Sequence, residues 1–284
     1  MENAEGYIKV EITTTDPVQR DLIIGIFNFT GCEFEEEHNV LAAYFRSQDY
    51  DPVLISNLLD PMMVPYSAER VLSKNWNEEW ERNFTPVIVS AFCCIRASFH
   101  AAEPGVRHDI IITPRMSFGT GHHATTFLMI EQMELLSCRG RNILDFGTGT
   151  GILAILAEKL GAAKVMAIDN DYWSIENATQ NIAENGCTNI TIQQSAYIEG
   201  GEEFDVILAN INRNVLLEHM KSISQHLKKD GVVIMSGLLT GDQEKISASV
   251  HNVGLEISVM KEREGWIVLQ LVHNQLATYF NIKD

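Results

Sequence analysis

The chain has 284 residues and a hydrophobic content of 45%, which is typical of a globular protein with one large or two modest domains. No apolar run approaches the ~18 residues of a membrane-spanning helix, and the acidic start at Met1–Glu5 is unlike an export signal. The five cysteines include no Cys-x-x-Cys pair, so we expect neither zinc nor disulfides and predict a cytoplasmic protein with reduced thiols.

The net charge of −17 is concentrated near the N-terminus, because residues 1–83 hold 16 acidic and 6 basic side chains. Such a surface repels phosphate backbones and attracts basic partners. Simple solubility explains the same charge, so the charge balance by itself leaves both interpretations open. We expect no direct binding to nucleic acid and none to a membrane.

Residues 1–72 predict a small α+β domain. The order strand, helix, strand, strand, helix, strand is typical of a ferredoxin-like split βαβ unit. Asp16-Pro17 and Asp51-Pro52 each place an N-cap residue before a proline at the first helical position. The expected elements are 7–12, 16–31, 34–37, 39–45, 51–59 and 62–72, the last interrupted by Pro65 as in an edge strand.

A linker helix is expected over residues 73–86. Trp76, Trp80 and Phe84 recur every four residues and therefore share one helical face, and Pro86 ends the helix. This aromatic face either packs between two domains or forms one wall of a substrate cleft.

From residue 87 onward, apolar strands come to alternate with amphipathic helices. A first hairpin is expected to pair 87–99 with 109–113 around Glu103-Pro104-Gly105. The later alternation predicts a mostly parallel sheet covered by helices on both faces, with an antiparallel hairpin at the C-terminus. The strands are expected at 142–146, 164–169, 189–194, 204–209, 231–236, 255–261 and 266–273, and the helices at 152–160, 172–184, 214–228 and 242–250.

The segment Ile143–Gly151 reads Ile-Leu-Asp-Phe-Gly-Thr-Gly-Thr-Gly and predicts a buried strand, a glycine turn and a helix start. Glycine permits a sharp turn and a close approach of a ligand to the backbone. A dinucleotide fold prefers its third glycine where this chain has Ile152, and the sequence contains no Gly-Lys pair of a P-loop. Gly147 and Gly149 therefore predict a nucleoside-bearing cofactor, and their spacing favours S-adenosylmethionine over NAD.

Asp169 closes the next apolar strand, 22 residues after Gly147. This spacing is close to the ~20 residues expected for a carboxylate that binds ribose hydroxyls. Asp169 would otherwise cap the helix that starts near Tyr172, but Asp171 is better placed for that role. The spacing therefore favours a ligand-binding role for Asp169.

Asn210 follows the apolar strand 204–209. Ligands of open α/β sheets bind at the carboxyl ends of strands, where an asparagine can contact both a cofactor and an incoming amine. Asparagine is also a common turn residue after a strand. Spacing alone leaves these two interpretations open.

The glycine-rich stretch Ser117–Thr126 precedes the glycine turn and leads into a helix. Thr125 or Thr126 lies in the first turn of this helix, where nearby backbone amides are expected to hold a carboxylate such as a methionine tail. His122 and His123 have no Asp, Glu or Cys at ligand spacing, so we predict no metal site. A general-base role for either histidine stays open.

These motifs resemble the ribosomal protein L11 methyltransferases, bacterial enzymes that methylate amino groups of that large-subunit protein. The resemblance covers nearly the whole chain, and its specific part is the stretch from Phe118 to Thr126 before the glycine turn. It implies a small acidic substrate-recognition domain over 1–72, a linker helix over 73–86, and a Rossmann-like class I methyltransferase domain over 87–284.

The resemblance also implies S-adenosylmethionine as the cofactor and a basic ribosomal protein as the substrate. The chain departs from the family at His122-His123-Ala124, where Thr-His-Pro is common, and at Ile211-Asn212, where Ile-Leu is common. The implied cofactor contacts are Thr126, Gly147, Gly149, Asp169 and Asn210, and the residues expected to position the amine are Asn210, Phe118 and Gly119.

Other functions compete with this interpretation. A methyltransferase acting on RNA or a small molecule is one, although the acidic N-terminal domain argues against RNA. The segment Asn210–Arg213 differs from the Asn-Pro-Pro-Tyr of glutamine-methylating relatives. A noncatalytic ribosome-assembly factor is the alternative from another class. We expect the protein to be a monomer.

Overall fold

The computed structural model describes residues 7–14, 16, 19, 23, 33–37, 40–47, 49–71, 85–113 and 123–274. The chain divides into two compact units, Met1–Arg82 and Asn83–Asp284. Three predictions lie outside the described residues in whole or in large part: the helix at 16–31, the linker helix with its aromatic face, and the loop that carries Phe118 and Gly119.

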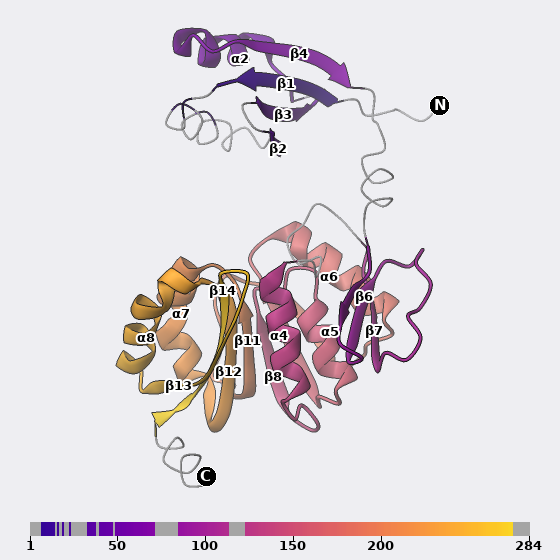
Figure 1. The fold of residues 1–284 in the computed structure, drawn as a ribbon, viewed down its shortest axis with the longest axis vertical. Helices are drawn as coiled ribbons and strands as arrows, with labels where there is room; N and C mark the ends of the chain where they lie inside the picture. The colour runs from indigo at the N-terminus through magenta and orange to yellow at the C-terminus, as the bar shows by residue number, and fades with distance from the viewer. Residues whose placement is uncertain are drawn as a thin grey trace. The chain divides into compact units, whose positions relative to one another are not determined.

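The described part of the first unit contains an antiparallel four-stranded sheet in the order β2-β3-β1-β4 (Figure 1). This order is that of the predicted ferredoxin-like unit, in which β1 lies between the two strands of the second half. The elements are β1 (Tyr7–Thr13), β2 (Glu33–Glu37), β3 (Val40–Arg46), α2 (Pro52–Leu59), a 3-10 turn (Asp60–Met62) and β4 (Tyr66–Val71).

The core of this unit forms between β1, β3 and α2. Ile12, Leu41 and Ile55 are among its fully buried side chains. Helix α2 begins as predicted, because the Asp51 carboxylate accepts the N–H groups of Val53 at 2.9 Å and Leu54 at 3.2 Å. The last strand starts four residues later than predicted, because the 3-10 turn extends to Met62 and Met63 follows it with a left-handed φ of 52°.

The second unit begins with a three-stranded sheet, ordered β5-β6-β7, from β5 (Val87–Val89), β6 (Cys93–Arg96) and β7 (His108–Ile111). The predicted pairing of 87–99 with 109–113 as a hairpin is wrong, because β6 pairs with β7 in parallel and with β5 in antiparallel fashion. A parallel pair needs a returning connection. The Arg96 side chain holds that connection by donating to the carbonyl oxygens of Ala97 and His100 while binding Asp109 on β7.

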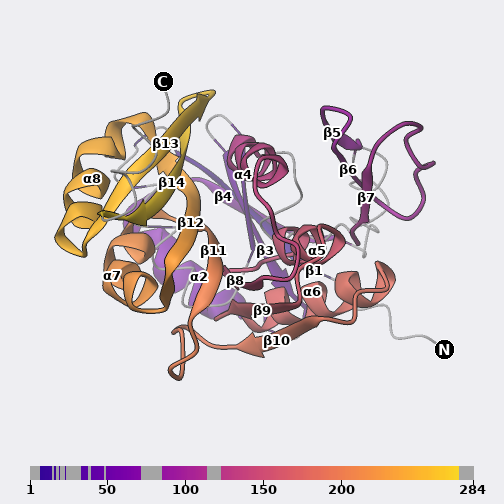
Figure 2. The same cartoon turned by 90° about the horizontal axis from the view of Figure 1, so that it is seen from below.

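Seven strands of the described chain form the large sheet of this unit, in the order β10-β9-β8-β11-β12-β14-β13 (Figures 1 and 2). All neighbours from β10 to β12 are parallel, whereas β14 is antiparallel to both β12 and β13, as predicted. The strands are β8 (Asn142–Phe146), β9 (Lys164–Asp169), β10 (Ile190–Gln194), β11 (Phe204–Asn210), β12 (Leu227–Leu239), β13 (Leu255–Arg263) and β14 (Trp266–His273).

Helices cover both faces of this sheet. In both views α4, α5 and α6 lie on one side, and α7 and α8 lie on the other (Figures 1 and 2). Helices α7 and α8 pack on the sheet through a buried apolar cluster that includes Leu216, Met220 and Ile246. The helices are α4 (Ala124–Glu134), α5 (Ile152–Lys159), α6 (Tyr172–Glu184), α7 (Arg213–Gln225) and α8 (Gln243–Asn252), with a 3-10 turn at Thr240–Asp242.

Candidate active site

The glycine turn connects β8 to α5 at the carboxyl end of the sheet's central strands. Gly147, Gly149 and Gly151 all have left-handed φ angles, of 75°, 54° and 82°. Residues with a Cβ rarely adopt such angles, so this run of three glycines permits the turn. The backbone N–H groups of Gly147 and Thr148 both donate to the Ile168 carbonyl, at 2.8 and 2.9 Å, which holds the turn against β9.

Asp169 is the last residue of β9 and also contacts the turn. One oxygen of its carboxylate accepts the N–H of Gly149 at 2.9 Å, and the other accepts the N–H of Asp171 at 3.0 Å. Asp171, in turn, caps α6 by accepting the N–H of Ser174 at 2.8 Å. Asp171 therefore caps α6 as predicted, whereas Asp169 lies beside the glycine turn and its ligand-binding role stays a prediction.

Asp145 lies beneath the turn and is fully buried. Its Oδ2 accepts the Thr148 hydroxyl at 2.6 Å and the Ala154 N–H at 3.1 Å, while Oδ1 has no hydrogen-bond partner among the described residues. Burial raises the pKa of Asp145 to about 7, and the charge of Asp169 acts in the same direction, against the two hydrogen bonds. A neutral carboxyl group below this pH therefore ties the turn to the first turn of α5.

Ile211 follows β11 and packs closely against Gly147 and Gly237. A Cβ atom at Gly147 would lie 2.2 Å from Cγ2 of Ile211, and one at Gly237 would lie 2.1 Å from its carbonyl oxygen. Gly237 also has a left-handed φ of 85° and lies where the pairing of β12 with β14 shifts register. The close approach of Ile211 to the residue after β8 and to β12 requires both glycines.

Asn210 ends β11 and points toward the start of α4. Its side-chain amide donates to the Thr126 hydroxyl at 3.3 Å. The structure thus brings together the predicted residues Gly149 with Asp169, and Asn210 with Thr126. Ile211 contacts Gly147 and links the two pairs.

His123 caps α4, a role that sequence patterns do not signal because histidine is not a typical N-cap residue. Its Nδ1 accepts the Thr125 N–H at 3.3 Å and lies 2.8 Å from the Thr125 hydroxyl oxygen. The Thr126 N–H donates to the His123 carbonyl at 3.0 Å. The backbone amides of Thr125 and Thr126 are therefore engaged within the chain, and a carboxylate site at nearby amides stays a prediction.

The tip of the terminal hairpin contributes residues that sequence reasoning missed. The Trp266 ring meets the His123 ring edge to face with centroids 4.5 Å apart, and the Arg263 guanidinium lies 3.7 Å from the centre of the Phe127 ring. The Glu264-Gly265 turn predicts a hairpin, but nothing in the sequence places its tip against the start of α4. These aromatic contacts fix the side of the site next to Thr126.

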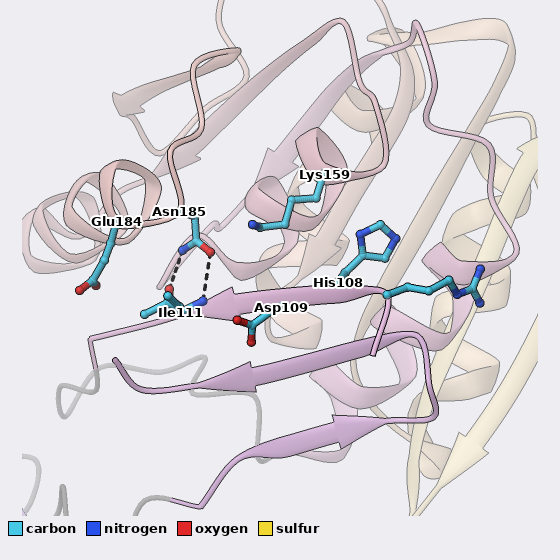
Figure 3. Close-up of a pocket in the computed structure, with 7 residues that line it drawn as sticks. His108, Asp109, Ile111, Lys159, Glu184 and Asn185 are labelled. Carbon is cyan, nitrogen blue, oxygen red and sulfur yellow. Dashed lines mark hydrogen bonds between the residues drawn. The ribbon is translucent and has the colours of Figure 1, made fainter. Parts of the chain in front are cut away.

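A polar pocket lies beside β7, lined by residues that include Arg107, His108, Lys159 and Glu184 (Figure 3). Lys159 is the last residue of α5, so the pocket lies at the opposite end of this helix from the glycine turn. Burial lowers the pKa of His108, and the neighbouring Arg107 and Lys159 charges act in the same direction. The pocket is separate from the residues predicted to bind the cofactor.

Other predictions concern features elsewhere in the chain. The described cysteines, Cys93, Cys94, Cys138 and Cys187, are free thiols. Within the described ranges, no three His, Cys, Asp or Glu side chains are grouped as metal ligands would be. None of the helices in the described part of the chain is long and apolar enough to cross a membrane.

A glycine turn after the first strand, a carboxylate after the second and an asparagine after the fourth lie on a sheet with an antiparallel seventh strand. This combination defines the class I methyltransferase fold. The sequence identifies the branch of that class: residues 9–274 match the family model of ribosomal protein L11 methyltransferases (PrmA), and the chain belongs to this family.

Individual relatives agree with this membership. The chain is 38% identical over 245 residues to the ribosomal protein L11 methyltransferase of Porphyromonas gingivalis, covering 84% of each chain. It is 34% identical to that of Phocaeicola vulgatus, covering 94% of this chain and 99% of the relative. The crystal structure of ribosomal protein L11 methylase from Lactobacillus delbrueckii subsp. bulgaricus superposes with a TM-score of 0.64 at 30% identity, over 67% of this chain and 99% of that one.

Proposed function

We propose that the protein transfers methyl groups from S-adenosylmethionine to amino groups of ribosomal protein L11, on lysine side chains, the N-terminus or both. The observation that carries the proposal is a pair of hydrogen bonds made by predicted site residues at the carboxyl end of the parallel strands. Asp169 binds the glycine turn at Gly149, and Asn210 binds Thr126 next to it. The names of the relatives supply the substrate.

The residues present fit the cofactor. Asp169 offers carboxylate oxygens at the end of β9, where two ribose hydroxyls can donate to them. The glycines at 147 and 149 permit the tight left-handed turn that presents its backbone at the carboxyl end of the strands. When bound there, S-adenosylmethionine supplies an electrophilic methyl group on a sulfonium.

On the substrate side, the chain's own residues have to position a neutral amine. A lysine amine has a pKa of about 10.4, so its neutral form at pH 7 costs roughly 4–5 kcal/mol. Burial lowers the pKa of an amine, so entry into the site favours the form with a free lone pair. The proton then leaves to water before attack and no dedicated base is required. Positioning by Asn210, held by Thr126, supplies much of the rate.

We assign substrate recognition to the acidic N-terminal region over 1–72, joined by a linker over 73–86 to a catalytic domain over 87–284. The net charge of −10 over residues 1–83 supports this, because a basic ribosomal protein is attracted to such a surface. Ribosomal proteins are made in the cytoplasm, and we place the protein there as a monomer.

The test is incubation with isotopically labelled S-adenosylmethionine and ribosomal proteins from a strain that lacks the enzyme, followed by mass spectrometry. Label on amino groups of L11 is expected. Label on RNA alone overturns the proposal. Binding of the ribosomal protein without cofactor binding in calorimetry supports a noncatalytic assembly factor instead.

Asn210→Ala tests the amine-positioning role. Transfer should fall by roughly 10- to 100-fold, because small displacements of the reacting groups cost this much. Asn214→Ala is the matched control, since Asn214 is exposed on α7, four residues further along. Equal turnover in the two variants removes the role assigned to Asn210.

A further inference from the structure

Asn181 on α6 and Asn185, its C-cap residue four positions later, pair with the outer edge of β7 and the residues after it. Asn185 accepts the Ile111 N–H at 3.0 Å and donates to the Ile111 carbonyl at 2.6 Å (Figure 3). Asn181 accepts the Thr113 N–H at 2.8 Å. The intervening Ile112 N–H points the other way and donates to Arg96 on β6 at 2.9 Å.

The spacing explains why a helix can take the place of a strand here. Four helical residues rise about 6.0 Å, and two strand residues advance about 6.6 Å. Amide side chains at positions i and i+4 of a helix therefore match alternate backbone groups of an extended segment. The hydrogen bonds of Asn181 and Asn185 therefore connect the three-stranded sheet to α6.

Asn181 differs from Asn185 in having a second partner in the candidate active site. Its Nδ2 donates to the Thr150 carbonyl, inside the glycine turn, at 2.8 Å, and the Asn181 side chain is fully buried. Helix α6 also packs directly on the turn, because a Cβ atom at Gly151 would lie 3.3 Å from Cβ of Ala178. One amide group thus joins the glycine turn to Thr113, two residues beyond the end of β7.

We propose that Asn181 is a positioning residue for the cofactor, which braces the glycine turn against the β5-β6-β7 sheet through its bonds to Thr150 and Thr113. The inference rests on the proposed function, because it takes the glycine turn as the S-adenosylmethionine site. Asn181 acts through the backbone of the turn and has no assigned contact with the cofactor.

Removing this amide removes its bond to the buried carbonyl of Thr150 and its bond to the partly buried N–H of Thr113. Such a loss is large enough to change an affinity by about tenfold. In Asn181→Ala, the dissociation constant for S-adenosylmethionine should therefore rise about tenfold. Asn185→Ala is the matched control, because it removes two bonds to the same edge and none to the turn. It should lower the thermal stability while changing the cofactor dissociation constant less than twofold.

A second variant separates positioning from a general loss of structure. Asn181→Asp has nearly the same shape, and its protonated carboxyl group can both accept from Thr113 and donate to Thr150. Its ionised form places an oxygen against the Thr150 carbonyl and loses that bond. The ratio of its cofactor dissociation constant to that of the wild type should therefore fall toward one as the pH decreases. Glu184, which accepts the Thr113 hydroxyl, is present in both proteins and cancels in the ratio.

Calorimetry with S-adenosylmethionine on the full chain decides the inference. Weakened binding in Asn181→Ala but not in Asn185→Ala, with recovery of Asn181→Asp at low pH, supports it. Equal effects of the two alanine variants, or an Asn181→Asp ratio independent of pH, overturn it. A wild-type chain that does not bind S-adenosylmethionine overturns the proposed function itself, whereas normal wild-type binding with unchanged Asn181→Ala binding overturns this inference alone.

Discussion

The carboxylate of Asp169 accepts the backbone N–H of Gly149 at 2.9 Å, so the end of β9 and the middle of the glycine turn form one unit. The second oxygen of the same carboxylate accepts the N–H of Asp171. Asp169 therefore orients the turn in addition to its proposed bonds with ribose hydroxyls. This hydrogen bond therefore joins Asp169, which is predicted from its distance along the sequence from Gly147, to Gly149, which is predicted from the glycine motif.

Asp169→Asn should weaken S-adenosylmethionine binding at least about tenfold, because the amide nitrogen must face one of the two N–H groups or a ribose hydroxyl. Asp171→Ala is the control. It removes the cap of α6 and should cost about 1 kcal/mol of stability without a comparable loss of affinity. Calorimetry and urea unfolding measure the two effects. Similar affinities for the two variants would contradict the role of Asp169.

Gly147→Ala should destabilise the protein by more than a left-handed φ alone requires. The strain of φ 75° costs an alanine about 1 kcal/mol, and the added Cβ lies 2.2 Å from Ile211. Gly105→Ala isolates the strain, because Gly105 has φ 84° and nothing within 4 Å of a Cβ. In urea unfolding, Gly105→Ala should lose about 1 kcal/mol and Gly147→Ala at least twice that.

The double variant Gly147→Ala with Ile211→Ala identifies the cause. Removing Cγ2 of Ile211 relieves the clash and should restore part of the stability lost by Gly147→Ala. The coupling between the two substitutions should be favourable and exceed about 0.5 kcal/mol. Strictly additive effects on the free energy of unfolding would show that the Ile211 side chain does not cause the loss of stability in Gly147→Ala.

The alternation of apolar strands and amphipathic helices was enough to predict the large sheet, because each element carries local signals. Helix α6 has the predicted bounds, Tyr172–Glu184, since Asp171 caps its start and Gly186 turns with φ 66° after its end. For such a helix the information lies within a few residues of its ends. The position of Asp169 follows from a longer spacing, 22 residues after Gly147, which spans one strand, one turn and one helix.

Strand pairing in the small sheet and the hydrogen-bond partners of the α6 asparagines are not predictable from local sequence. The Pro104-Gly105 turn is real, with φ 84° at Gly105, but it lies within a returning connection and not at the tip of a hairpin. Asn181 and Asn185 lie at helical spacing and read as an ordinary polar face of α6. Their partners Ile111 and Thr113 are about 70 residues away in sequence, and the second partner of Asn181, Thr150, is 31 residues away, so only the folded structure reveals them.

Arg96 should prove essential to the parallel pairing of β6 with β7. Its guanidinium is mostly buried, binds Asp109 at 2.7 Å through Nη2, and donates to two carbonyl oxygens of the returning connection. Arg96→Lys keeps the charge but cannot reproduce this planar set of donors, so we expect a loss of about 2 kcal/mol in urea unfolding.

Arg107→Lys is the matched control for Arg96→Lys. Arg107 is 62% exposed and pairs with Glu134 at the surface, where a lysine can keep the ion pair. Exposed pairs contribute little, so the change should be within about 0.5 kcal/mol. Equal losses for the two substitutions would show that the burial of Arg96 has no energetic consequence.

Asp145 should give the folded protein a distinctive dependence on pH. Its pKa is raised from 3.8 to about 7 by burial, so between these values the folded state holds a proton that the unfolded state has released. The free energy of unfolding should therefore fall as the pH rises through this range. Asp242 behaves in the opposite way, because its hydrogen bond to Arg213 lowers its pKa. Its contribution to the free energy of unfolding is therefore constant above pH 5.

Asp145→Asn tests this argument, because the amide cannot titrate and its oxygen can still accept from Thr148 and Ala154. Its nitrogen would lie where Oδ1 has no described partner, so no existing bond is lost. Relative to wild type, the variant should gain more than about 1 kcal/mol in unfolding free energy between pH 5 and 7.5, since each pKa unit corresponds to about 1.4 kcal/mol. Asp242→Asn should show a constant difference from wild type over the same range. Urea unfolding at several pH values measures both, and parallel curves for Asp145→Asn and wild type would mean that Asp145 is ionised throughout.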